Sequence, residues 1–202
     1  MKKTLLSLGA IAFVTLGALV ACNADQKPSE KTEGLVVAGA TTPSADEMIA
    51  RGRYLVTIMG CGDCHTPKIM TAQGPAPDTA HLLGGHPAQL SVPAPNQEAL
   101  KSWVLFSPTL TAYAGPWGVS YAANISSDES GIGNWSEEQF FRAMREGKYK
   151  GLPNGRPLLP PMPWQQFAQA TDEDLRAIFS FLKSTQPVAN VVPAAAPPTA
   201  AK

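Results

Sequence analysis

The sequence predicts an all-α domain with long loops rich in proline and glycine. Three segments place apolar residues at the spacing of one helix face, and each begins at a residue that can cap a helix. No stretch alternates strictly between apolar and polar residues between two hairpin turns, so we do not expect a sheet. The 19 prolines cluster outside the three segments, which predicts extensive irregular loops.

The first helical segment begins at the capping box Ser44-x-x-Glu47 and ends at Gly60. It contains Gly52, and a glycine inside a helix costs up to about 1 kcal/mol relative to alanine. That cost is tolerable where another helix crosses closely. We expect the crossing helix to be the third segment, with Phe179 at the contact.

The other two helical segments lie in the second half of the chain. One begins at Ser136-x-x-Gln139 and ends at Gly147. The last begins at Thr171, where three acidic residues follow at the positive end of the helix, and it is closed by Pro187. A core built from three such helices is small, and a large covalently bound cofactor would add to it.

Length and charge limit the classes of protein to consider. A chain of 202 residues has room for one compact domain with appendages. We assign the domain to residues 44–186, a flexible tether to 22–43 and a tail rich in proline and alanine to 187–202. Because 16 basic residues balance 16 acidic ones, no nucleic-acid partner is expected.

The N-terminus has the layout of a bacterial lipoprotein signal peptide over residues 1–21. Two lysines precede an apolar stretch, which ends in Leu19-Val20-Ala21-Cys22 and so resembles a lipobox. We expect export and lipidation of Cys22, which would hold the domain on a membrane, facing the periplasm. The alternatives are an uncleaved membrane helix and a plain signal peptide. By the same resemblance, Asn23 slightly favours the outer membrane.

Cys61-Gly62-Asp63-Cys64-His65 is a Cys-x-x-Cys-His sequence, the attachment sequence of haem c. Two thiols on one helical turn can both reach the vinyl positions on one edge of a porphyrin and form thioethers. The imidazole of His65 then projects beneath the iron as its proximal ligand. The sequence therefore predicts one covalent haem c, held by Cys61, Cys64 and His65.

Cys61 and Cys64 have three alternative interpretations. A thioredoxin-type redox motif needs a βαβ context, which the sequence lacks, and leaves His65 unexplained. A zinc site could add His81 and His86, but Gly84-Gly85 between them prevents the shared helix that a zinc finger requires. A structural disulfide between the two thiols is the third alternative.

Met162 is our candidate for the sixth ligand of the iron. It lies in Leu158-Leu159-Pro160-Pro161-Met162-Pro163-Trp164, where prolines on both sides restrict the backbone. A thioether is a soft donor that favours ferrous iron and raises the reduction potential. The alternatives are a core methionine at this position and ligation by His81 or His86. We interpret the remaining methionines of the domain as packing residues: Met48, Met59, Met70 and Met144.

An ordered set of motifs runs from about residue 50 to residue 193. The set consists of Arg51-Gly52-x-Tyr54-Leu55, the haem motif followed by Thr66-Pro67, Gly84-Gly85, Asn124-Ile125-Ser126-x-Asp128, Gly131-Ile132-Gly133-x-Trp135-Ser136, Met162-Pro163-Trp164-x-x-Phe167, Asp172-Glu173-Asp174-Leu175 and Pro187-Val188-x-Asn190. In this set the chain resembles bacterial c-type cytochromes related to the cytochrome subunits of membrane-bound alcohol, aldehyde and gluconate dehydrogenases.

The resemblance implies a class I cytochrome c-like fold, in which the helix before the haem motif crosses the last helix. It also implies that Met162 is the distal ligand and that Asn124 and Trp135 lie near the haem. The alternative for these two is a turn asparagine and a core tryptophan. Many relatives carry two or three haems, whereas this sequence has one attachment motif, so it resembles a single module of such subunits.

These observations predict an electron carrier rather than an enzyme. The expected partners are redox proteins: a dehydrogenase, an oxidase or reductase, or another cytochrome. The second hypothesis is a haem enzyme, peroxidase-like or acting on a sulfur compound, in which the sixth site opens and His81 or His86 serves as the acid or base. A haem sensor is disfavoured because the sequence has no recognisable output domain.

Overall fold

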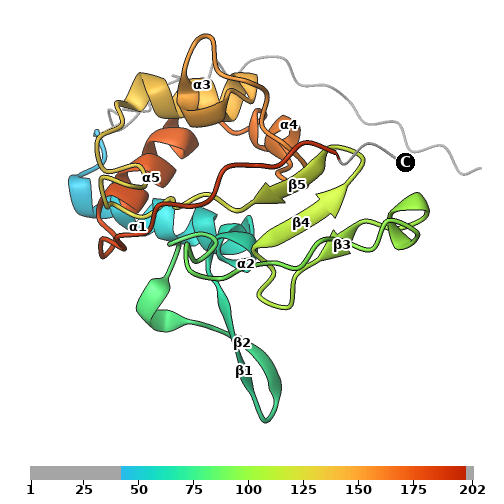
Figure 1. Cartoon of the computed structure of the whole chain (residues 1–202). Coiled ribbons are helices and arrows are strands. Elements are labelled where there is room, and N and C mark those ends of the chain that lie inside the picture. Colours follow the sequence, from blue (N-terminus) through green and yellow to red (C-terminus); the bar gives the residue numbers. More distant parts are fainter. Residues whose placement is uncertain (1–41, 199–202) are drawn as a thin grey trace, which may run out of the picture. The chain divides into compact units, whose positions relative to one another are not determined.

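Helix α1 (Ala45–Ile58) lies against helix α5 (Asp172–Lys183) at the centre of the fold (Figure 1). This computed structural model describes residues 42–198. The predicted signal peptide, the lipidation site Cys22 and nearly all of the predicted tether lie outside the described residues. Within residues 42–198, no helix is long and apolar enough to cross a membrane.

The described residues form five α-helices and two small antiparallel sheets, so the prediction of an all-α fold is wrong. The fold is mixed α and β. The remaining helices are α2 (Cys61–His65), α3 (Glu137–Glu146) and α4 (Trp164–Phe167), with 3₁₀ turns at Thr79–His81, Ala99–Lys101 and Tyr149–Gly151. One sheet pairs β1 (Lys68–Thr71) with β2 (Gly74–Pro77), and the other has the order β3 (Leu105–Phe106), β4 (Ala112–Gly115), β5 (Gly118–Tyr121).

The strands carry little of the pattern by which strands are recognised in a sequence. β2 is Gly-Pro-Ala-Pro, and prolines are depleted from strands, but here they are tolerated because β1 and β2 form an isolated two-stranded ribbon. All four residues of β4 are buried, so no alternation between apolar and polar residues marks it. The turn between β4 and β5 is Pro116-Trp117, closed by Gly118 at φ +95°.

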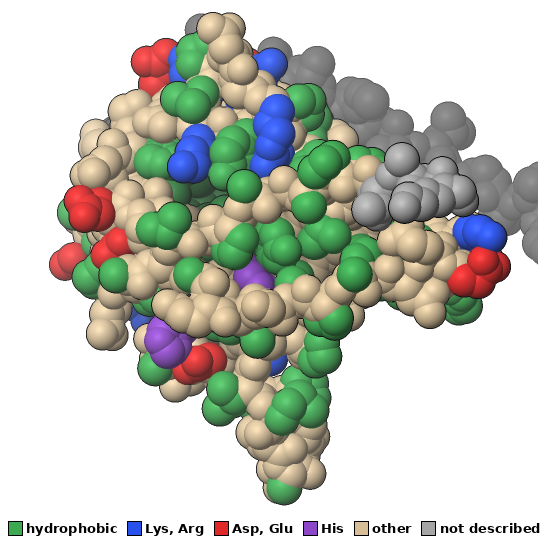
Figure 2. All heavy atoms as spheres, in the orientation of Figure 1, with side chains coloured by type: hydrophobic (Ala, Val, Ile, Leu, Met, Phe, Trp, Pro, Cys, Tyr) green, Lys and Arg blue, Asp and Glu red, His purple; other side chains and the backbone are tan. Residues whose placement is uncertain are grey.

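The β1–β2 hairpin extends away from the body of the domain, at the foot of Figure 1. Its strands pair from Lys68 with Pro77 to Thr71 with Gly74. Ile69 and Met70 are exposed on it, and green apolar side chains reach its tip in Figure 2. Met70 is therefore a surface residue, and the prediction that it serves as packing is wrong.

Helix α1 begins and ends as its sequence predicts. The Ser44 hydroxyl oxygen accepts from the Glu47 amide at 3.3 Å, and the Glu47 carboxylate accepts from the Ser44 amide at 2.8 Å, which is the reciprocal capping box. Gly60 follows the helix in the left-handed region, with φ +67°. This conformation turns the chain from α1 into the haem motif.

The close crossing of α1 and α5 depends on Gly52. A Cβ atom placed on Gly52 would lie 1.9 Å from the Ala177 carbonyl oxygen and 2.7 Å from the Phe181 Cβ. The crossing by the last helix is therefore confirmed, but the contact is made by Ala177 and Phe181. Phe179, the residue we expected there, stacks on Phe140 instead, with ring centroids 5.2 Å apart.

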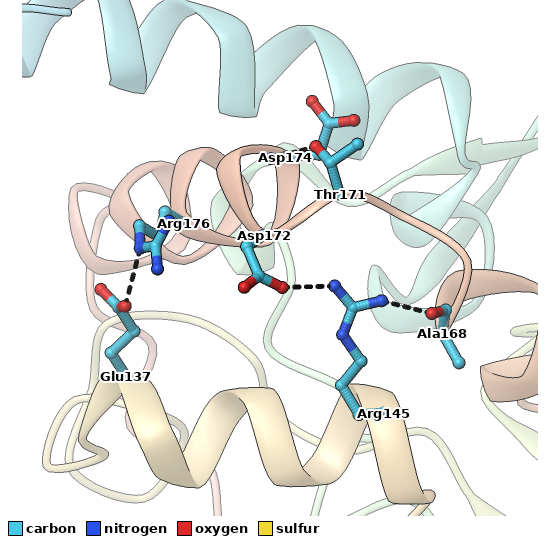
Figure 3. A network of polar contacts seen from close by, with 7 residues as sticks. All are labelled: Glu137, Arg145, Ala168, Thr171, Asp172, Asp174 and Arg176. Atoms are coloured by element: carbon cyan, nitrogen blue, oxygen red, sulfur yellow. Dashed lines mark hydrogen bonds and ion pairs between the residues drawn. The ribbon is translucent and has the colours of Figure 1, made fainter. Parts of the chain in front are cut away.

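Ion pairs also join α5 to α1 and to α3. Arg51, beside Gly52, donates from Nε to the Asp174 carboxylate at 2.8 Å. Figure 3 shows two more pairs that join α3 to α5, Arg145 with Asp172 at 2.6 Å and Arg176 with Glu137 at 3.1 Å. Because these side chains are partly exposed, each pair contributes on the order of 1 kcal/mol or less.

Helices α3 and α5 also begin where predicted. Ser136 caps α3 by accepting from the Gln139 amide, and Thr171 caps α5 by accepting from the Asp174 amide, both at 3.1 Å. α3 ends at Gly147, with φ +62°. The buried core lies between α1, α3 and α5 and consists of Leu55, Val56, Leu83, Ile132, Phe140, Met144, Leu175, Ala177, Ile178 and Leu182.

Replacement of Gly52 by alanine should destabilise the fold. The added methyl group cannot fit against the Ala177 carbonyl, so α1 and α5 must separate, and overpacking of this kind costs about 1 to 3 kcal/mol. Urea unfolding followed by circular dichroism measures the loss. Ala50→Ser, at an exposed position of the same helix, is the control and should change the free energy of unfolding far less. Equal stability of the two variants would contradict the close crossing.

Candidate functional site

The predicted haem motif forms the short helix α2, which is held in place at both ends. Gly60 precedes it in the left-handed conformation. At its other end, the Lys68 ammonium group donates to the carbonyl oxygens of Gly62, Asp63 and Thr66, at 3.2, 2.9 and 2.6 Å. A positive donor at the carbonyl end of a helix satisfies groups that have no partner within the helix. The haem motif is therefore a rigid turn.

Cys61 and Cys64 lie on this turn as free, half-buried thiols. Burial raises the pKa of Cys61 to about 11, so its thiol is protonated at neutral pH. A redox motif of the thioredoxin type requires a lowered thiol pKa, which disfavours that reading. Within the described part of the chain, no group of three or more His, Cys, Asp or Glu side chains is placed to bind a metal ion. Two free thiols on one turn suit attachment to a porphyrin.

The His65 ring is oriented by a backbone carbonyl from a distant part of the chain. Its Nδ1 lies 2.7 Å from the Ala123 carbonyl oxygen. Because a carbonyl can only accept, Nδ1 carries the proton, and Nε2 keeps a free lone pair. Burial lowers the pKa of His65, which favours the neutral ring. A neutral imidazole whose second nitrogen donates to a carbonyl is the usual form of a metal-ligating histidine.

Gly84 and Gly85 allow a loop to close on the segment that bears Ala123. Gly85 has φ +76°, and a Cβ there would lie 2.5 Å from the Ala123 carbonyl carbon. In this position the Gly85 amide donates to the His65 carbonyl at 2.8 Å. The His86 amide donates to the Ala122 carbonyl at 2.9 Å. The Gly84-Gly85 motif thus serves a close approach of three backbone segments around His65.

Met162 lies on the proline-rich segment that leads into α4. It is half-buried and packs against the hydrophobic core, as Cys61 does. The segment is held by the Ser120 hydroxyl, which donates to the Pro160 carbonyl at 2.6 Å. The structure thus brings Met162 and Cys61 to one apolar cluster, and ligation of iron by Met162 stays a prediction.

His86 and His81 are placed for other roles than ligation or acid–base chemistry. His86 is fully buried, and its ring nitrogens pair with the Thr111 hydroxyl at 2.9 Å and the Leu90 carbonyl at 3.0 Å. The His81 side chain is largely exposed and pairs with the Asp78 carboxylate at 2.7 Å. Neither histidine supports the rival ligand set or the enzyme hypothesis.

The resemblance places two further residues, Trp135 and Asn124, near the haem. Trp135 is half-buried against the hydrophobic core. Asn124 follows Ala123 directly and is only 5% exposed, with its amide group surrounded by hydrogen-bond partners. Sequence reasoning did not find the Ala123 carbonyl, because a backbone acceptor leaves no signature in the residue type.

Comparison with known proteins finds similarity to cytochrome subunits of dehydrogenases. No family model matches the chain. The fructose dehydrogenase cytochrome subunit of Gluconobacter japonicus is 29% identical over 176 residues, 87% of this chain and 27% of that protein. The gluconate 2-dehydrogenase cytochrome c subunit of Pantoea cypripedii is 30% identical over 71% of this chain and 25% of its own length. The alcohol dehydrogenase (quinone) cytochrome c subunit of Gluconobacter oxydans is 31% identical over 74% of this chain and 24% of its own length.

The geometry of the Cys-x-x-Cys-His turn agrees with these similarities to cytochrome c subunits. The chain is related to the cytochrome c subunits of fructose, gluconate and alcohol dehydrogenases, which confirms the relation predicted from its motifs. Haem c follows as the cofactor. The chain spans about a quarter of the length of these relatives.

Replacement of His86 by glutamine tests its structural role. Burial lowers the pKa of His86, so as the pH falls below about 6.5 the unfolded chain binds a proton that the folded protein excludes. Stability should therefore fall with falling pH, and His86→Gln should reduce this slope by at most about 1.4 kcal/mol per pH unit. Denaturant unfolding between pH 5 and pH 7.5 measures it. An unchanged slope, or a changed haem spectrum, would contradict the assignment.

Proposed function

We propose that this protein is an electron carrier that holds one haem c, with His65 and Met162 as the axial ligands of the iron. The observation that carries the proposal is the hydrogen bond from His65 Nδ1 to the Ala123 carbonyl, which leaves Nε2 free beside two free thiols on the same turn. The relatives' names as cytochrome subunits support electron transfer rather than catalysis. The single attachment motif supports one haem.

Each of these residues has a defined task in electron transfer. When bound, the haem supplies reversible one-electron chemistry. Cys61 and Cys64 hold it by thioether bonds, and His65 presents Nε2 in an orientation set by Ala123. Met162, on a segment stiffened by prolines, offers a soft donor that stabilises the reduced state. Two protein ligands keep the coordination number constant, so little rearranges when an electron moves.

The setting of this electron transfer is proposed from the sequence and the relatives. A signal peptide over residues 1–21 and lipidation at Cys22 would place the domain in the periplasm on a membrane, with the outer membrane slightly favoured. We propose a dehydrogenase as the electron donor, because the relatives are subunits of dehydrogenases. The electrons would pass on to a respiratory oxidase, a reductase or another cytochrome.

Replacement of Met162 by alanine tests the axial ligand. The variant should keep its covalent haem, show a lower reduction potential, and bind external ligands such as cyanide that the unaltered protein excludes, because the soft donor is gone. Intact mass, a redox titration and optical spectra measure these effects on protein matured in a host that attaches haem c.

Met70→Ala is the matched control for this experiment, because Met70 is 71% exposed on the β1–β2 hairpin. It should leave the potential and the spectrum unchanged. A Met162→Ala protein with the native six-coordinate spectrum and potential would show that another group ligates the iron. An intact mass without added haem would overturn the whole proposal.

Replacement of Cys22 by alanine tests the membrane anchor. Without the thiol that carries the lipid, the protein should either accumulate unprocessed or be released from the membrane fraction, and labelled palmitate should no longer be incorporated. Cell fractionation and gel mobility measure both outcomes. Ser29→Ala, in the predicted tether, is the control and should behave like the unaltered protein. Unchanged fractionation and labelling of the Cys22 variant would rule out lipidation at this residue.

A further inference from the structure

Asn124 is the centre of a buried hydrogen-bond network next to the carbonyl that binds His65. Its side-chain oxygen accepts from the Ser126 amide at 3.0 Å and from the Ser126 hydroxyl at 2.8 Å. Its side-chain nitrogen donates to the Val188 carbonyl at 2.7 Å, with the Ser130 hydroxyl and the Asn190 carbonyl each at 3.2 Å. The amide is thus bonded on both its oxygen and its nitrogen, which fixes its orientation.

Asn190 forms the second half of this network. Its side-chain nitrogen donates to the Gly84 carbonyl at 2.7 Å and to the His86 carbonyl at 2.9 Å, and its side-chain oxygen accepts from the Ala88 amide at 2.9 Å. Gly85, whose amide donates to the His65 carbonyl, lies between the first two of these contacts. Asn190 therefore holds the loop that grips the backbone of His65.

His65 is gripped at two points, its ring by the Ala123 carbonyl at 2.7 Å and its own carbonyl by the Gly85 amide at 2.8 Å. The segment with Ala123 is followed directly by Asn124, and the segment with Gly85 is held by Asn190. The Asn124 side-chain nitrogen lies 3.2 Å from the Asn190 carbonyl oxygen. Asn190 lies in the segment that follows α5, and Asn124 bonds to the same segment. This segment therefore closes the network behind the histidine.

We propose that Asn124 is a positioning residue for His65, which fixes the Ala123 carbonyl and thereby sets the orientation and donor strength of Nε2 toward the iron. This inference rests on the proposed function, since it requires His65 to be the proximal ligand. A strong bond from Nδ1 to a carbonyl makes the ring a better electron donor, which favours ferric iron. Loss of the bond weakens the donor, so the reduction potential should rise.

The test replaces Asn124 by alanine in the haem-loaded full chain. Without the Asn124 amide group, the hydrogen bonds that fix the residue next to Ala123 are lost. The Ala123 carbonyl can then move, which weakens its hydrogen bond with His65 Nδ1. We expect a more positive reduction potential and an exchange of the His65 Nδ1 proton with solvent that is faster by roughly tenfold, which corresponds to about 1.4 kcal/mol, the size of one lost hydrogen bond. A redox titration and proton NMR measure the two quantities.

Two controls separate positioning from general stability. Gly52→Ala weakens the α1–α5 crossing, so it should speed Nδ1 exchange only in proportion to its loss of stability and should leave the reduction potential unchanged. Asn134→Ala removes an exposed asparagine and should change neither stability nor potential. If Asn124→Ala changed only the stability, in the way that Gly52→Ala does, Asn124 would be a structural residue and the inference would be wrong.

A measurement on the unaltered protein covers the case in which Asn124→Ala fails to fold. The Nδ1 proton of His65 should exchange only on the timescale of the slowest backbone amides of α1 and α5, because the network must open before solvent reaches it. Rapid exchange would overturn the inference. Attached haem with His65 ligation but without these effects would refute the positioning role alone, whereas absence of haem or of His65 ligation would refute the proposed function.

Discussion

The site depends on one hydrogen bond, from His65 Nδ1 to the Ala123 carbonyl oxygen. This bond decides which ring nitrogen carries the proton and therefore which one is left free to ligate the iron in the proposed site. A histidine on a five-residue helix could otherwise rotate and exchange tautomers. Because the acceptor is a backbone carbonyl, its position is only as fixed as the segment around it. The surrounding hydrogen bonds of Asn124 and Asn190 serve to keep that segment still.

The frame that supports the site is the crossing of α1 and α5. Because Gly52 has no side chain, the Ala177 carbonyl of α5 can approach the backbone of α1 closely. The ion pair of Arg51 with Asp174 joins the same two helices. Helix α2 then leaves α1 through the left-handed turn at Gly60. Motifs that are far apart in the sequence are therefore partners in space. The arginine of the first motif binds Asp174 at the acidic start of the last helix, and the glycine lies against Ala177 in the same helix.

The predicted all-α fold class was wrong, and the particular strands explain why. Helices were found because their caps and their apolar faces are local: Ser44, Ser136 and Thr171 all cap as expected. The strands are at most four residues long, one is half proline, and another is buried on both sides. Burial does alternate along β2 and β5, but over only four residues each, which is too short to stand out in the sequence. Their pairing is decided by contacts between segments, and it makes a mixed fold of a chain whose local signals are helical.

What the sequence alone determined is the chemistry that lies within one helical turn. Cys61, Cys64 and His65 lie within one five-residue motif, and their spacing is sufficient to predict haem attachment. What only the tertiary structure decided is how that motif is held. The acceptor for His65 lies 58 residues away, and His86 is buried with both ring nitrogens paired to other groups of the chain. Spacing along a chain specifies local geometry, whereas a backbone carbonyl or a buried hydrogen bond acquires its role only when distant segments meet.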